Sequence, residues 1–174
     1  MSSQVWFTVL VALVGVERLA EMVVARRNAA WSFARGGIET GRRHWPFMVA
    51  LHLALLVGAV VEVWVADRPF IGWLGWPMLA LVVLAQGLRW WCIRTLGHQW
   101  NARVIVVPGS PRVTSGPYRW FAHPNYVAVV VEGIALPLVH TAWVTASVFT
   151  LLNAWVLTVR LRDEEQALHR LVGP

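Results

Sequence analysis

Residues 114–126 read TSGPYRWFAHPNY, a polar, turn-rich and aromatic stretch set between long apolar runs. Gly116-Pro117 and His123-Pro124 place two stiff turns on either side of a short aromatic and basic segment. A chain that needed only to cross a bilayer would have no use for such a stretch. We therefore predict that residues 114–126 form a fixed, non-helical loop at a membrane surface and carry the chemistry of the protein.

The composition around this stretch is that of an integral membrane protein. Of 174 residues, 57% are hydrophobic and 14% are charged, whereas a soluble domain carries about 25% charged residues. A helix that spans a bilayer needs about 20 mostly apolar residues. Five runs meet or approach that length. We expect an all-α membrane domain over residues 1–174, with spans at residues 4–25, 45–66, 70–93, 125–139 and 142–161, the last two forming a tight hairpin.

The charges predict how the chain is oriented. The net charge is +6 and all 15 Lys and Arg positions are Arg. These arginines gather after the first, third and fifth runs, and the intervening loops hold only Arg68. By the positive-inside rule we expect the N-terminus outside and residues 26–44, 95–124 and 162–174 in the cytoplasm of a bacterial inner membrane, in contact with lipid. Residues 103–109 predict a β-like run closed by a turn, and residues 163–168 predict a helix that continues the fifth span.

Several classes of site find no support in the sequence. The six histidines lack the spacing of metal ligands, and the single cysteine, Cys92, lies in an apolar run where we expect it to be buried. Basic-aromatic nucleic-acid modules, Gly-x-Ser-x-Gly elbows, Gly-x-Gly-x-x-Gly turns and phosphate-binding P-loops do not occur in it. We therefore expect neither a metal site nor a nucleic-acid partner.

Charged residues inside the apolar runs point to polar sites within the membrane. Glu132 lies deep in the fourth run and needs a partner or a cavity, for which Arg89 is the best candidate. Burial would suit Glu132 to act as a general base. Glu17, Arg18 and Glu21 interrupt the first run, and they mark either a functional site or charges that pair with arginines of the next loop.

Three further acidic positions lie near the ends of runs. Glu62 stands close to Arg68, which predicts a surface pair. Glu164 and Glu165 lie where the fifth run leaves the membrane, and they are either a solvated helix start or carboxylates that bind a cationic cofactor.

The motifs of the C-terminal half resemble a known family. The stretch 114–119, then His123-Pro124-x-Tyr126, a helical hairpin and Glu164-Glu165-x-x-Leu168, is similar to the isoprenylcysteine carboxyl methyltransferases, which are membrane enzymes that use S-adenosylmethionine. The resemblance implies that this cofactor lies between the loop and the last two helices. It further implies a set of cofactor-binding residues: the backbone of Val113, Thr114, Ser115 and Gly116, together with Tyr118, His123, Pro124, Tyr126, Glu164 and Glu165.

The remaining motifs favour a bacterial subgroup. In the family an arginine commonly precedes His-Pro, but here it is Ala122, which argues against a prenylcysteine carboxylate as the acceptor. Trp100-Asn101-x-Arg103-Val104 resembles proteins that O-methylate alkylpyrones or alkylresorcinols, the lipid-tailed products of type III polyketide synthases. This resemblance implies an enol or phenol that enters from the bilayer and a type III polyketide synthase as pathway partner. Asn101 and Arg103 would orient its oxygen, and Glu132 or His123 would remove its proton.

Four alternatives stay open. The chain could methylate an isoprenylcysteine-type carboxylate or a phospholipid amine, it could be a non-catalytic membrane protein, or it could be a membrane reductase that uses a nicotinamide cofactor.

Overall fold

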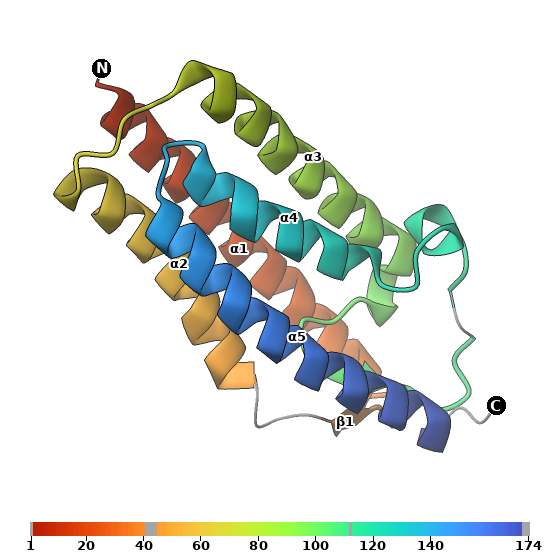
Figure 1. Cartoon of the computed structure of the whole chain (residues 1–174). Coiled ribbons are helices and arrows are strands. Elements are labelled where there is room, and N and C mark those ends of the chain that lie inside the picture. Colours follow the sequence, from red (N-terminus) through yellow and green to blue (C-terminus); the bar gives the residue numbers. More distant parts are fainter. Residues whose placement is uncertain (1, 41–44, 112, 172–174) are drawn as a thin grey trace.

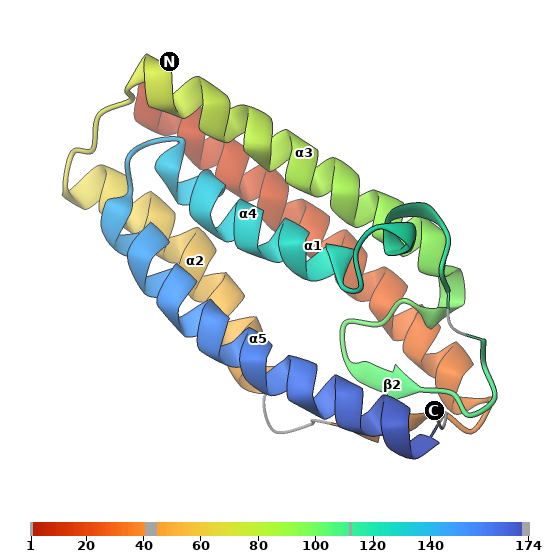
Figure 2. The ribbon, with the colours of Figure 1, turned by 45° about the vertical axis from the view of Figure 1, so that its right-hand side comes forward.

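Five long helices run side by side along the molecule (Figures 1 and 2). The structure is a computed structural model that describes residues 2–40, 45–111 and 113–171. For residues 163 and 165–171 it describes the backbone only. The helices are α1 (Ser3–Phe33), α2 (Trp45–Val65), α3 (Gly72–Leu96), α4 (Pro124–Leu138) and α5 (Trp143–Leu171). The prediction of an all-α protein with five helices is confirmed. Because their number is odd, the two termini lie at opposite ends of the bundle.

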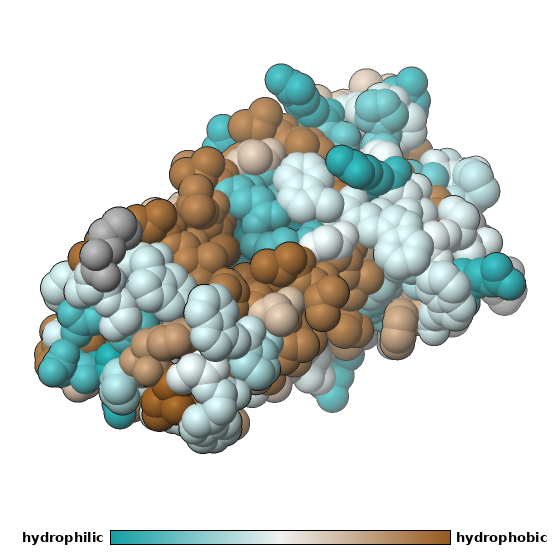
Figure 3. All heavy atoms as spheres, turned by 90° about the horizontal axis from the view of Figure 1, so that it is seen from above, coloured by the Kyte–Doolittle hydropathy of each residue, from teal (hydrophilic) through white to brown (hydrophobic). Residues whose placement is uncertain are grey.

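Three of these helices are long and apolar enough to cross a membrane, over Trp45–Val65, Gly72–Gln99 and Trp143–Arg162. Helix α4 has 15 residues and therefore spans about 22 Å, less than the roughly 30 Å of a hydrocarbon core. Helix α1 is long enough but carries charges in its middle. Apolar side chains gather around the middle of the face in Figure 3, and hydrophilic ones toward its ends. The chain is a multi-pass membrane protein.

Helix α1 extends eight residues beyond the predicted end of the first span. Residues 26–44 were predicted as a cytoplasmic segment that follows the first span. Asn28 of this segment is buried, and its side chain donates hydrogen bonds to the carbonyl oxygens of Gly97, at 3.0 Å, and Trp100, at 2.7 Å. These contacts hold the last two turns of α1 against the end of α3. Residues 26–33 therefore belong to the helix and not to a loop.

A short sheet closes the same end of the bundle. Strand β2 (Val104–Val106) lies in the run that predicted a β-like segment, and it pairs antiparallel with β1 (Ile38–Thr40), with Ile38 opposite Val106. The partner strand was not predicted. The pair lies against α5 (Figure 2), so it joins the segment after α1 to the loop after α3.

The α4–α5 hairpin confirms the predicted pairing of the last two runs. The two helices are joined by residues 139–142, where Thr141 adopts a positive φ of 54° and its hydroxyl donates to the carbonyl of Pro69 at 2.8 Å. The helices approach closely at Gly133, because a Cβ built there would lie 2.0 Å from Cε1 of the buried Phe149. Only glycine fits at this contact.

Glu62 of α2 caps the start of α5. Its Oε2 accepts hydrogen bonds from the backbone nitrogen of Thr145 at 2.7 Å and from the hydroxyl of Thr145 at 2.8 Å, and its Oε1 accepts one from the backbone nitrogen of Val144 at 3.1 Å. Arg68 pairs with the same carboxylate at 2.8 Å. The predicted pair exists, but the prediction of a surface location was wrong. The Glu62 side chain is 10% exposed and satisfies the free amides of a helix N-terminus.

We predict that Gly133→Ala destabilises the protein whereas Gly87→Ala does not. An added methyl at position 133 overlaps the Phe149 ring, and overpacking of this kind costs about 1–3 kcal/mol. At Gly87 of α3 nothing lies within 4 Å of a built Cβ, so the same change should be neutral or slightly stabilising. Thermal unfolding in detergent measures both, and equal melting temperatures for the two variants would contradict the close packing of α4 on α5.

Candidate functional site

Four side chains from the loop, α4 and α5 form one connected group, which we call the loop–α5 cluster: His123, Tyr126, Arg160 and Glu164. The Tyr126 hydroxyl donates to Glu164 Oε2 at 2.5 Å and accepts from Arg160 Nε at 2.8 Å. The His123 ring stacks on the Tyr126 ring, with centroids 5.3 Å apart and planes 12° from parallel. His123 Nδ1 lies 3.9 Å from Glu164 Oε1. Residues separated by 41 positions in the sequence thus share one site.

This cluster is partly open to solvent. The side chains of His123 and Glu164 are each 28% exposed, whereas Arg160 is 7% exposed. A carboxylate beside two stacked aromatic rings is suited to a ligand that carries a positive charge or hydroxyl groups. Pro124 begins α4 and fixes the backbone there, which places His123 just before the helix and Tyr126 in its first turn.

The preceding loop is held against α3 by Gly116. This glycine has a φ of +56°, and a Cβ built on it would lie 2.5 Å from the Thr95 hydroxyl. Thr114 and Ser115 stay exposed beside it, and Val113 is half-buried. Burial, helped by nearby Cys92 and Glu164, raises the pKa of Tyr118, so its hydroxyl stays neutral. The loop therefore offers open backbone next to the loop–α5 cluster.

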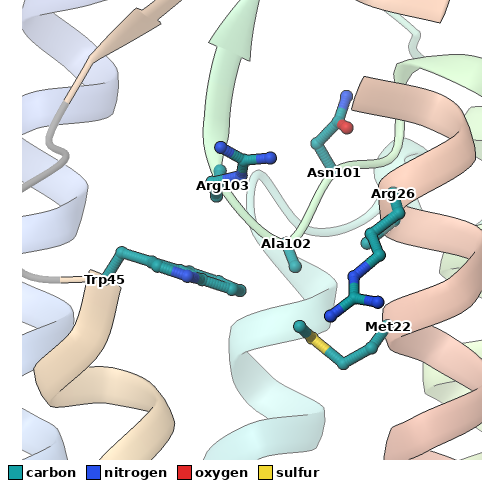
Figure 4. A pocket seen from close by; sticks show the side chains of 7 residues that line it. Met22, Arg26, Trp45, Asn101, Ala102 and Arg103 are labelled. Carbon is teal, nitrogen blue, oxygen red and sulfur yellow. The ribbon is translucent and has the colours of Figure 1, made fainter. Parts of the chain in front are cut away.

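A second feature is a pocket of about 270 Å³ at the same end of the bundle (Figure 4). We call it the α1–α2 pocket. Figure 4 shows the Arg26 and Met22 side chains reaching into it from α1, with Trp45 of α2 opposite. Its lining is a mixture of cationic, amide and apolar groups: Met22, Ala25, Arg26, Trp45, Asn101, Ala102 and Arg103.

Two polar residues of this pocket come from the chain just before β2. Arg103 Nη1 lies 3.3 Å from both carboxylate oxygens of Glu39 in β1. The Asn101 amide nitrogen donates to the Ser32 hydroxyl at 3.3 Å, while its oxygen, which is buried, has no hydrogen-bond partner among the described residues. Arg103 and Asn101 both lie on the pocket wall, and the guanidinium can bind an oxygen-bearing ligand.

Arg160 connects the two features. Its Nε binds Tyr126, and its Nη1 reaches Met48 Sδ on α2 at 3.1 Å. Met48 lies three residues after Trp45, which is one helical turn from the pocket wall. The loop–α5 cluster and the α1–α2 pocket are therefore neighbours.

A network of ion pairs joins α1, α3 and α4, about one helical turn from the pocket along α1. Glu132 Oε2 accepts from Arg18 Nη2 and from Arg89 Nη2, each at 2.6 Å. Arg18 Nη1 also donates to Glu21 Oε2 at 2.5 Å, and Arg89 Nε lies 3.4 Å from Glu21 Oε1. The prediction that Arg89 pairs with Glu132 is confirmed.

Glu17 completes this network. Its Oε1 accepts from Trp90 Nε1 at 2.5 Å, and its Oε2 accepts from the Gln86 amide. The charges of the first helix therefore pair within the bundle, with α3 and α4, and among the described residues none of them pairs with an arginine of the following loop. We use the name ionic network for this set: Glu17, Arg18, Glu21, Gln86, Arg89, Trp90 and Glu132.

The predicted site residues fall into three places. His123, Tyr126 and Glu164 meet in the loop–α5 cluster, while Asn101 and Arg103 line the pocket. Glu132 lies in the ionic network, about one and a half turns further along α4 than Tyr126. The predicted Glu165 has its side chain outside the described residues. Its role, like the roles of the others, stays a prediction.

Sequence reasoning missed Arg160, Arg26 and Trp45. Arg160 was counted only as an orienting charge, although it stands four residues before Glu164 and hence on the same helix face. That spacing could have linked it to the cluster. Arg26 and Trp45 carried no local signal, because the pocket exists only once α1, α2 and β2 come together.

Comparisons with known proteins agree with this architecture. The model of the isoprenylcysteine carboxyl methyltransferase family matches residues 78–170. The chain is 39% identical to the uncharacterized protein YpbQ of Bacillus subtilis, covering 93% of this chain and 96% of that one. It is 26% identical to an uncharacterized protein of Haemophilus influenzae, covering 88% of this chain and 90% of that one.

A solved structure also matches. The eukaryotic intramembrane Ras methyltransferase, an isoprenylcysteine carboxyl methyltransferase, superposes with a TM-score of 0.60 and 26% identity over 74% of this chain. The match covers 47% of that enzyme, so this chain spans about half its length.

We predict that Glu132→Gln strongly destabilises the fold. The change leaves the buried Arg89 and the half-buried Arg18 without their shared anion, and removing one partner of a buried pair costs about 3–5 kcal/mol. Arg103→Gln is the control, because that side chain is 34% exposed and its loss should cost no more than about 1 kcal/mol. Thermal unfolding in detergent distinguishes the two, and a Glu132→Gln protein as stable as the control would contradict the network.

Proposed function

Because this chain belongs to the isoprenylcysteine carboxyl methyltransferase family of S-adenosylmethionine-dependent membrane enzymes, we propose that it is an O-methyltransferase for a lipid-tailed enol or phenol. The observation that carries this proposal is the loop–α5 cluster, which joins the His-Pro turn to the acidic end of α5 through the Tyr126–Glu164 hydrogen bond. Both elements of the family resemblance thus contribute to one open, polar site.

The cluster fits S-adenosylmethionine. Glu164 keeps a solvent-facing carboxylate that can accept hydrogen bonds from ribose hydroxyls, and the stacked His123 and Tyr126 rings present π-faces to a sulfonium. The exposed backbone around Thr114 and Ser115 offers donors and acceptors for the polar parts of the cofactor. When bound, the cofactor supplies an electrophilic methyl group. Arg160 holds Tyr126 in place, and Tyr126 holds Glu164.

The α1–α2 pocket suits the acceptor. Asn101 and Arg103 can bind and orient its oxygen, and the Trp45 ring offers a face for a planar head group. The pocket lies between α1 and α2, so a hydrocarbon tail can extend toward the bilayer while the head group stays beside the loop–α5 cluster. Holding both reactants in this way, away from bulk water, can lower the barrier by about 7–11 kcal/mol.

An isoprenylcysteine-type carboxylate is a second candidate acceptor. The guanidinium groups of Arg26 and Arg103 on the pocket wall would bind a carboxylate as readily as an enolate. Ala122, which is exposed at the turn before His123, supplies no further cation and favours the enol or phenol. Incubating the purified chain with methyl-labelled S-adenosylmethionine and either an alkylresorcinol or an S-prenylated cysteine separates the two. Turnover of only the carboxylate would end the proposal.

The cellular setting is part of the proposal. The arginine distribution supports an outside N-terminus, with the loop–α5 cluster facing the cytoplasm of a bacterial inner membrane, where the cofactor is made. A type III polyketide synthase would then supply the acceptor.

We predict that Glu164→Gln weakens S-adenosylmethionine binding about tenfold to a hundredfold. The change removes the charge that would accept hydrogen bonds from the ribose hydroxyls, and hydrogen bonds to charged groups contribute about 1.5–3 kcal/mol. Asp67→Asn, which also removes one negative charge but lies at the opposite end of the bundle beside Gln4, should leave the affinity unchanged. Calorimetric titration measures both dissociation constants, and equal values for the two variants would place the cofactor elsewhere.

A further inference from the structure

The ionic network carries more negative than positive charge. Among the described residues it joins three carboxylates to two guanidinium groups: Glu17, Glu21, Glu132, Arg18 and Arg89. Its members lie far from either end of their helices, and Glu21, Arg89 and Glu132 are buried. An unbalanced charge in this environment raises the affinity of the network for a proton, as a general base requires.

Glu21 has a buried carboxylate oxygen that accepts no hydrogen bond from the described residues. Both oxygens of Glu17 already accept hydrogen bonds, from Trp90 and Gln86, and Glu132 Oε2 accepts two from guanidinium groups. Glu21 Oε2 accepts one from Arg18, but its Oε1 is buried and accepts none from the described residues. Arg89 Nε lies 3.4 Å from it and is itself unsatisfied.

The network adjoins the α1–α2 pocket along one face of α1. Glu21 lies one turn before Ala25, and Arg18 lies one turn before Met22, and both Ala25 and Met22 line the pocket. Arg26, one turn further, is also on the wall. A single helix face therefore leads from the cavity where an acceptor head group would lie to the buried carboxylate with a free oxygen.

We propose that Glu21 accepts the hydroxyl proton of an un-ionised acceptor during methyl transfer. This inference rests on the proposed function. The acceptor oxygen forms its bond to the methyl carbon while the carbon–sulfur bond breaks and leaves its electron pair on sulfur. The O–H proton passes to Glu21 Oε1. The network then holds two carboxylates and two guanidinium groups, so the transfer neutralises its excess charge, and the proton is later released to water.

Charged groups on three helices face Glu21 and set its proton affinity. Glu17 and Arg18 lie on its own helix, Arg89 on α3 and Glu132 on α4. His52 of α2 also interacts electrostatically with the network, but its Nδ1 contacts the Met48 carbonyl at 2.8 Å and it forms no ion pair among the described residues.

The test compares two acceptors that differ in acidity. A long-chain alkylresorcinol has a phenol that stays protonated at neutral pH, as a tyrosine does, whereas a 4-hydroxy-6-alkyl-2-pyrone is a vinylogous acid and is already ionised. Glu21→Gln should lower kcat with the resorcinol by about a hundredfold or more, as expected for loss of a general base. With the pyrone the loss should stay below about twofold. Asp67→Asn is the control, because it also removes one negative charge but lies beside Gln4 at the opposite end of the bundle, and it should leave kcat with both acceptors unchanged.

A binding measurement checks the same contact without turnover. In cofactor-free protein, Glu21→Gln should weaken binding of the alkylresorcinol about tenfold, because the hydroxyl loses its anionic acceptor. Binding of the corresponding dimethyl ether should not change. If Glu21→Gln does not fold, Glu21→Asp keeps the charge but withdraws the carboxylate, and it should lower kcat with the resorcinol alone.

The outcomes separate the inference from the proposed function. An equal loss with both acceptors, no loss with either, or a wild-type enzyme that methylates only the pyrone would overturn the role of Glu21. A wild-type protein that methylates neither probe would instead overturn the proposed acceptor class.

Discussion

The carboxylate of Glu132, shared between Arg18 and Arg89, is the interaction on which the rest of the bundle depends. In a bilayer, apolar packing does little to choose one arrangement of helices over another, because lipid tails are as apolar as leucine. An ion pair has no such freedom, since neither partner can face the lipid alone. The two hydrogen bonds to one oxygen therefore fix α1, α3 and α4 relative to one another, and they explain how a helix with Glu17, Arg18 and Glu21 in its middle can lie within a membrane protein.

The other two helices are positioned by polar contacts near their ends. Glu62 of α2 caps α5 at one end of the hairpin, and Arg160 of α5 reaches Met48 of α2 near the other. Helices α2 and α5 are thereby held as a pair, with α4 packed on α5 and α1 packed on α2, and the α1–α2 pocket lies at one end of that second contact. The same contact that aligns α5, through Arg160, also orients Tyr126 in the loop–α5 cluster. Stability of the fold and geometry of the site thus share residues.

Much of this arrangement could be predicted from local patterns. Apolar runs and turn residues located the five helices, the hairpin and the β-like run at residues 103–109, and an intramembrane Glu132 required a cation that Arg89 supplied. What could not be predicted depends on contacts between distant segments. The continuation of α1 to Phe33 follows from Asn28 binding the end of α3, and strand β1 exists only because β2 lies beside it. Glu62 was misplaced at the surface because its partner, the start of α5, lies more than 80 residues away.

The position of the pocket suits the reaction that we propose. A charged cofactor is soluble only in water and a lipid-tailed acceptor only in the bilayer, so the two can meet only where a polar end of the bundle adjoins its apolar middle. Helix α1 changes character along its length at this depth, from Arg18 and Glu21 to Met22 and Ala25 and then to Arg26. Helix α1 passes the ionic network, then the α1–α2 pocket, and then the polar end of the bundle. A head group bound beside Met22 would therefore have the ionic network on one side and the loop–α5 cluster on the other. A pocket one helical turn nearer the N-terminus of α1 would displace the ionic network. A pocket one turn nearer the C-terminus of α1 would expose the acceptor to water. The location of the site is therefore set by α1 as much as by the loop that carries the family motif.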